Sequence, residues 1–183
     1  QNYNALADYI DAEGSPLQGR VLGVFASGSF AIGAAILGKT KSTQHDVDAV
    51  LVLGGAYLED PETVLNDVFR AITRPDSQGR TRYQGKTMLN SRCITVTYDD
   101  GRSIDIMPVC EFILGQPDSD ECHYLFHHKA ESGKLVQSYH KRVRPKGFKR
   151  WYQDEDTKLV ASPKGFLFED AFRRSVHDQQ VLT

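Results

Sequence analysis

The stretch DVDAVLVL, residues 46–53, decides the fold of this chain. Within it, residues 47–53 are an apolar run rich in branched residues that stops at Gly54-Gly55, which is typical of a central β-strand. Residues two apart on a strand project to the same face, so Asp46 and Asp48 should point together while the residue after each packs into the core. Like charges held at one spot repel each other unless a cation lies between them, so this strand predicts a divalent metal site.

A second predicted strand carries a third carboxylate. Asp105 stands within the apolar stretch 103–109, where a purely structural carboxylate is poorly accommodated. If this strand neighbours the predicted strand 47–53, three carboxylates converge, and such oxygen donors suit Mg²⁺ with substrate phosphates completing its shell. The alternative is that each aspartate is a solvated cap or loop residue, as most aspartates are.

Gly28-Ser29 follows an earlier apolar strand and precedes a predicted short helix. Glycine lets the backbone approach a phosphate closely, and the serine hydroxyl and neighbouring amides can donate to phosphate oxygens. Together with the carboxylates, this turn favours nucleotidyl transfer from a nucleoside triphosphate. The predicted catalytic and metal-binding residues are Asp46, Asp48 and Asp105, and the predicted phosphate-binding residues are Gly28 and Ser29.

The remaining pattern predicts an α/β (α+β) domain with a mixed central sheet flanked by helices. Helices are predicted over residues 4–12, 30–37 and 61–72, the last with Asp60 as its cap and Pro61 at its first position. Further strands are predicted over residues 21–25, 93–98 and 103–109, the last two as a hairpin. Residues 39–45 and 74–86 are predicted as polar loops, and residues 115–135 as irregular.

The composition is that of an ordinary globular protein, with 183 residues of which 40% are hydrophobic. The 22 Lys and Arg nearly balance the 24 Asp and Glu, so the overall charge does not indicate a wholesale affinity for nucleic acid or membrane. The 3 cysteines form no CxxC motif, so a disulfide framework is not expected and a cytoplasmic location is predicted. No apolar run reaches membrane-spanning length.

The domain organisation is predicted in two parts. Residues 1–152 are expected to form the catalytic core, and residues 153–183 a linker and the start of a further helical region. Because the chain starts at Gln1 instead of Met, we expect it to be a fragment of a longer protein.

These residues resemble, in order, the pattern of the DNA polymerase β-like nucleotidyltransferase superfamily: a Gly-Ser turn, an Asp-x-Asp pair on the next strand, and a third Asp further on. Within it, the chain resembles the bacterial cyclic-oligonucleotide synthases related to cyclic GMP-AMP synthase, the CD-NTases of antiphage defence. The stretches that carry this resemblance are GSFAIG at 28–33, IDIMP at 104–108 and RPKGFKRWY at 144–152.

The resemblance implies an enzyme that uses ATP, GTP or other nucleoside triphosphates with two Mg²⁺ ions, or Mn²⁺, to make a cyclic di- or trinucleotide and release pyrophosphate. It implies that Asp105 also helps to activate the acceptor hydroxyl. Relatives continue into a helical second lobe, which we expect this chain to end before completing. Ala34 departs from the Thr that many relatives have. No membrane partner is implied, and a nucleic-acid or protein activator stays open.

The sequence also leaves other hypotheses about function open. The enzyme could transfer a single nucleotide to a protein, RNA or small-molecule hydroxyl. The chain could instead be a catalytically silent nucleotide-binding module that uses the basic stretch 141–150. Residues 33–40, GAAILGKT, match the P-loop pattern formally, but the polar residues 41–45 make a poor helix after it. The spacing of Cys110, Cys122 and the nearby histidines fits no standard zinc site.

Overall fold

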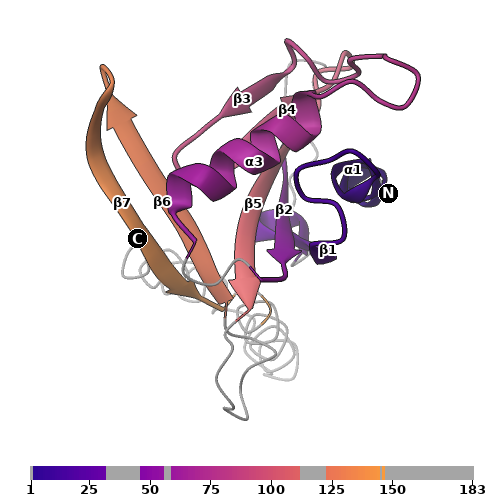
Figure 1. Cartoon of the computed structure of the whole chain (residues 1–183). Coiled ribbons are helices and arrows are strands. Elements are labelled where there is room, and N and C mark those ends of the chain that lie inside the picture. The colour runs from indigo at the N-terminus through magenta and orange to yellow at the C-terminus, as the bar shows by residue number, and fades with distance from the viewer. Residues whose placement is uncertain (1, 32–45, 56–58, 112–122, 145, 147–183) are drawn as a thin grey trace, which may run out of the picture. The chain divides into compact units, whose positions relative to one another are not determined.

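The structure, a computed structural model, describes residues 2–31, 46–55, 59–111, 123–144 and 146 (Figure 1). Within these ranges the helices are α1 (Asn2–Asp11), α2 (Gly28–Ala31) and α3 (Pro61–Thr73). The strands are β1 (Val21–Ser27), β2 (Asp46–Leu53), β3 (Thr87–Leu89), β4 (Ile94–Thr97), β5 (Ser103–Glu111), β6 (His123–Glu131) and β7 (Lys134–Val143).

The strands form one mixed sheet in the order β1-β2-β5-β4-β3, with β6 paired to both β5 and β7. β2 and β5 run parallel, and every other described pair is antiparallel. β4 pairs with the first half of β5 and β6 pairs with its end, so both lie along β5 opposite β2. The predicted mixed sheet and the predicted β4–β5 hairpin are therefore confirmed.

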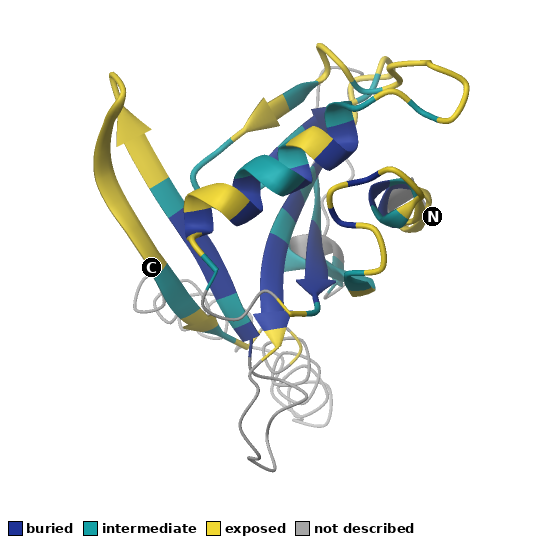
Figure 2. Ribbon diagram, viewed as in Figure 1, coloured by how far each residue is buried: buried dark blue, intermediate teal, exposed yellow. Residues whose placement is uncertain are grey.

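The helices α1 and α3 pack against one face of this sheet (Figures 1 and 2). Asp60 caps α3 by accepting a 3.0 Å hydrogen bond from the backbone N of Thr63, and Pro61 begins the helix, both as predicted. The apolar spacing of α3 turns one side of the helix toward the strands, and burying each such side chain contributes about 1.5–3 kcal/mol. The buried members include Val64, Leu65, Val68 and Ile72 from α3, Leu6 and Ile10 from α1, and Ala49, Leu51, Ile104 and Ile106 from the sheet.

The opposite face of the sheet has its own apolar cluster. Val50, Val52 and Val109 are buried there, with Phe25, Met107 and Val143 packed against them. Because β2 is buried on both faces beyond its first residues, its sequence is a continuous apolar run instead of an alternating one. By strand alternation this second face is the one that carries Asp48 and Asp105.

The prediction that residues 115–135 are irregular is wrong for residues 123–135, which form β6, a tight turn and the start of β7. The turn is made by Ser132 and Gly133, whose φ angles of 51° and 75° suit a two-residue hairpin loop. Polar residues hide the strand pattern of β6, since the buried positions include His123 and His127. The Ser-Gly pair was the available signal. Residues 115–122 lie outside the described residues.

Residues 1–145 make up one compact unit. The predicted boundary between residues 1–152 and 153–183 lies outside the described residues and stays a prediction. In the part of the chain that the structure describes, no helix is long and apolar enough to cross a membrane.

Candidate active site

The parallel pairing of β2 with β5 places two of the predicted carboxylates at neighbouring positions. Asp48 stands directly opposite Asp105, and Asp46 stands opposite Ser103. The two strands are thus neighbours, which was the condition for the carboxylates to converge. The side chain of Asp46 lies outside the description, so its part in the site stays a prediction.

Gly28 packs directly against Asp48. It stands at the junction of β1 and α2 with a φ of 59°, in the left-handed region that glycine tolerates. A Cβ atom at this position would lie 1.9 Å from Oδ2 of Asp48, so any other residue would collide with the carboxylate. The turn at Gly28, just before Ser29, therefore lies in contact with the carboxylate of Asp48. The side chain of Ser29 itself lies outside the description.

A chain of hydrogen bonds holds Asp105 from the other side. Oγ1 of Thr95 donates to Oδ1 of Asp105 at 2.5 Å, and Nδ2 of Asn90 donates to the same Oγ1 at 2.8 Å. Because the amide of Asn90 occupies a lone pair of the hydroxyl, the hydroxyl hydrogen is directed to Asp105. Asp105 is thus held through one oxygen, and among the described residues no hydrogen bond is recorded at its Oδ2.

Cys93 lies beside this chain. Nδ2 of Asn90 approaches its Sγ at 3.8 Å. Burial raises the pKa of the thiol, and the charge of Asp105 and, more weakly, that of Asp48 raise it further. Without a bound metal the thiol is therefore the neutral form at physiological pH.

The sequence prediction missed Asn90, Cys93 and Thr95. The hairpin register offered a signal for Thr95, which stands opposite Asp105 in the β4–β5 pair and so shares its face.

The other sequence hypotheses fare differently. Among the side chains that the structure describes, no three His, Cys, Asp or Glu residues gather as a metal cluster, and Cys122 lies outside the described residues. This set does not contain Asp46. The P-loop-like stretch 33–40 lies outside the described residues, and so does the end of the basic stretch 141–150.

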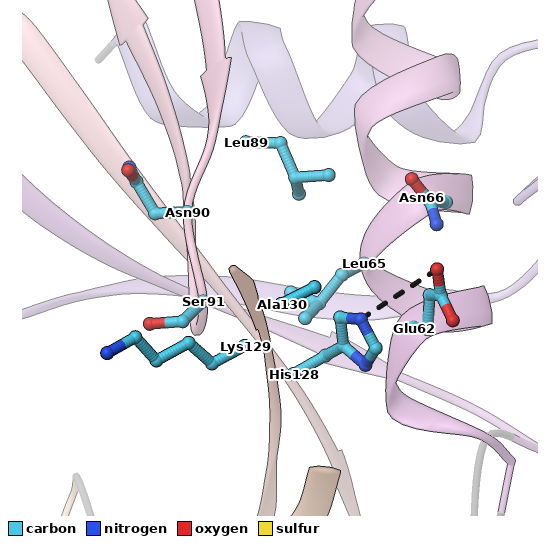
Figure 3. Close-up of a pocket in the computed structure, with 9 residues that line it drawn as sticks. All are labelled: Glu62, Leu65, Asn66, Leu89, Asn90, Ser91, His128, Lys129 and Ala130. Atoms are coloured by element: carbon cyan, nitrogen blue, oxygen red, sulfur yellow. Dashed lines mark ion pairs between the residues drawn. The ribbon is translucent and has the colours of Figure 1, made fainter. Parts of the chain in front are cut away.

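A cavity of about 480 Å³ lies between α3, β3 and β6 (Figure 3). It belongs to the α3 side of the sheet and includes none of the predicted site residues. His128 Nε2 lies 3.8 Å from Glu62 Oε1 across it. Its lining residues are Glu62, Leu65, Asn66, Leu89, Asn90, Ser91, His128, Lys129 and Ala130.

We expect Thr95→Val to lower the affinity of this face for Mn²⁺ by about 10-fold, because the orienting bond to Asp105 is lost while the shape of the side chain is kept. Free Mn²⁺ measured by electron paramagnetic resonance during a titration gives the affinity. Thr95→Ser should restore it, and Thr97→Val, an exposed position on the same strand, should leave it unchanged. Equal Mn²⁺ affinities for Thr95→Val and the unmodified protein would contradict a positioning role.

Comparison with known proteins places this geometry in a family. The cyclic dinucleotide synthase CdnG of Bradyrhizobium diazoefficiens is 36% identical over 109 residues, which are 59% of this chain and 24% of that protein. The c-di-GMP synthase of Roseivirga ehrenbergii is 24% identical over 155 residues, 83% of this chain and 36% of that protein. The chain thus matches between about a quarter and about a third of the length of these relatives.

Solved structures agree with the fold. CdnG of B. diazoefficiens in complex with GTP matches with a TM-score of 0.62 and 29% identity, over 82% of this chain and 39% of that one. The GTP-bound form of DncV from Vibrio cholerae matches with a TM-score of 0.52 and 12% identity, over 75% of this chain and 34% of that one, and at this identity shows the fold alone. Residues 1–118, more than half of the chain, match the model of a protein family. The chain belongs to the SMODS family, the Second Messenger Oligonucleotide or Dinucleotide Synthetase domains.

Proposed function

We propose that this chain is the catalytic core of a Mg²⁺-dependent nucleotidyltransferase that joins nucleoside triphosphates into a cyclic di- or trinucleotide second messenger and releases pyrophosphate. The observation that carries the proposal is the register of Asp48 and Asp105 on two parallel strands, with Gly28 packed against Asp48. Membership of the SMODS family and the similarity to proteins named as cyclic dinucleotide synthases support it.

The donor chemistry of this face fits Mg²⁺. Asp48 and Asp105 supply carboxylate oxygens at adjacent positions, and like charges placed there are destabilising without a cation. With Asp46, they would hold two Mg²⁺ ions or, alternatively, Mn²⁺. When bound, these ions would activate the attacking hydroxyl and neutralise the charge on the triphosphate and the departing pyrophosphate.

The chain's own residues contribute by position. Thr95 engages Oδ1 of Asp105, so Oδ2 is the oxygen that can orient the acceptor hydroxyl. The amides at the Gly28-Ser29 turn donate to the triphosphate of the donor nucleotide. Because Gly28 contacts Asp48, a triphosphate bound at the turn would lie at the same site as the carboxylates, which would hold the reacting groups close together.

The wider setting belongs to the same proposal. ATP, GTP or other nucleoside triphosphates are the substrates, and the similarity to a CdnG that was solved with GTP supports GTP among them. The resemblance to antiphage CD-NTases favours a role in antiphage signalling. A cytoplasmic location fits the free thiols of Cys93 and Cys110.

The test is to incubate the full-length protein with Mg²⁺ and all four ribonucleoside triphosphates, and to measure the masses of the products. We expect a cyclic di- or trinucleotide from the unmodified protein and none from Asp105→Asn, which keeps the size of the side chain but removes its charge. The bases in the product identify the substrates.

Other outcomes assign the alternatives. Single nucleotides attached to a protein, RNA or small hydroxyl compound would show that the enzyme transfers one nucleotide and does not cyclise. A protein that binds nucleotides but makes no product under any activating condition would be a binding module.

A further inference from the structure

The proposed function leaves unused one arginine, Arg92, which is close in sequence to the hydrogen-bond chain from Asn90 through Thr95 to Asp105. Arg92 lies in the segment between β3 and β4 and directly precedes Cys93, whose thiol feels the charges of Asp105 and Asp48. Nε of Arg92 donates to Nδ1 of His127 at 3.1 Å. The guanidinium is thereby tied to β6, the strand that pairs with the end of β5.

His127 lies on the face of the sheet that carries the aspartates. On β6, Leu125 stands opposite Val109 of β5. Residues two apart on a strand share a face, so Val109 lies on the same face as Asp105, and His127 on the same face as Leu125. The contact between Arg92 and His127 is therefore made on the carboxylate face.

The ring of His127 is held through both of its nitrogens and one of its faces. Its side chain is buried, its ring stacks on Tyr139 with centroids 4.5 Å apart, and its Nε2 lies 3.2 Å from Oε1 of Gln137. Arginine can only donate, so Nδ1 is the acceptor and Nε2 carries the hydrogen that Gln137 accepts. Burial lowers the pKa of His127, and the charge of Arg92 lowers it further, which keeps the ring neutral and Nδ1 able to accept.

The charge of Arg92 is not neutralised by this partner. Guanidinium stays protonated at any physiological pH, and its planar fork suits a phosphate group. Across the described ranges no carboxylate forms an ion pair with Arg92, whereas Arg20 pairs with Glu59 and Arg102 with Asp100. With Nε fixed on His127, the two Nη groups remain for an anion.

The position of Arg92 separates it from the Gly28-Ser29 turn. Gly28 follows β1, on one side of the β2–β5 pair, and Arg92 precedes β4, on the other side. Two nucleotides must meet at the aspartates for a cyclic dinucleotide to form. We propose that Arg92 binds a phosphate group of the second nucleotide, the one that supplies the acceptor hydroxyl. This inference rests on the proposed function.

The test is isothermal titration calorimetry of the full-length protein, in Mg²⁺, with nonhydrolysable GTP and ATP analogues and separately with the nucleosides guanosine and adenosine. We expect the unmodified protein to bind two nucleotides. Arg92→Ala should weaken one of the two sites by about 10- to 100-fold and leave nucleoside binding unchanged, because a hydrogen-bonded charge pair is lost. The nucleotide affinity of Arg92→Lys should lie between those of Arg92→Ala and the unmodified protein, since lysine keeps the charge without the planar fork.

The matched control is Arg70→Ala, which removes an arginine from the α3 side of the sheet and should bind like the unmodified protein. Thermal unfolding shows whether each variant is folded. If Arg92→Ala does not fold, the nucleotide affinity of Arg92→Lys is the test of the assignment. Two sites of unchanged affinity, or equal losses for nucleotides and nucleosides, overturn the assignment. If Arg92→Ala binds both nucleotides with unchanged affinity and the unmodified protein forms the cyclic product, the assignment of Arg92 is wrong and the proposed function stands. If the unmodified protein binds no nucleotide, the proposed function is wrong as well.

Discussion

Gly28→Ala is expected to lower the synthesis of the cyclic nucleotide by at least about 100-fold, because a displacement of about 1 Å among reacting groups has that effect. The added Cβ would lie 1.9 Å from Oδ2 of Asp48, so the carboxylate has to rotate or the turn has to move. Either shift separates the phosphate-binding turn from the aspartates. The φ of 59° adds about 1–2 kcal/mol of backbone strain for any L-residue.

Gly55→Ala separates the collision from the strain. Gly55 also has a positive φ, of 67°, but a Cβ there would meet no atom within 4 Å. We expect this control to lose the stability that the backbone strain alone costs, about 1–2 kcal/mol, and to keep its activity. Product formation is measured by mass spectrometry, and the free energy of unfolding by urea titration. A folded Gly28→Ala variant that works as well as Gly55→Ala would show that the contact with Asp48 does not matter for the reaction.

Asp48→Asn is expected to change activity and stability in opposite directions. Losing a carboxylate that would hold Mg²⁺ removes several kcal/mol of charge stabilisation, so product formation should fall by about 1000-fold. Without metal, however, the substitution removes a like charge from the position beside Asp105. We expect the unfolding temperature in EDTA to rise by about 2–4 °C, which corresponds to about 1 kcal/mol in a domain of this size.

The measurement is thermal unfolding of each protein in EDTA and in Mg²⁺. Mg²⁺ should raise the unfolding temperature of the unmodified protein and have little effect on Asp48→Asn, since binding to the folded state stabilises it. Asp8→Asn removes an equal charge from an exposed position of α1, and its unfolding temperatures in EDTA and in Mg²⁺ should equal those of the unmodified protein. An Asp48→Asn variant that is less stable in EDTA and still stabilised by Mg²⁺ would contradict a metal site at these aspartates.

Much of the fold was predictable because its local signals are strong. The apolar run of β2, the spacing and cap of α3, and the β4–β5 hairpin all depend on residues close together in sequence, and each is confirmed. The β6–β7 hairpin was missed because buried histidines and charged residues mask its alternation. Periodicity analysis counts a histidine as polar, while the structure buries His127 by giving both ring nitrogens partners.

The site was predictable in its residue types and not in its pairing. An aspartate within an apolar strand indicates a charged site, but the match of Asp48 with Asp105 comes from a parallel register that no local rule determines. The contact of Gly28 with Asp48 is likewise tertiary. Thr95 was within reach, since the short turn of the β4–β5 hairpin sets which residue faces Asp105.

The parallel join of β2 with β5 also has a consequence for how the chain folds. The β4–β5 and β6–β7 hairpins connect near neighbours in sequence, whereas β2 can meet β5 only after residues 54–102 have been accommodated between them. Such distant pairings form late, because the entropy of closing the loop opposes them until other contacts are in place. We therefore expect Asp48 and Asp105 to come together late in folding, so that a partly folded chain with both hairpins formed would have no assembled pair of aspartates.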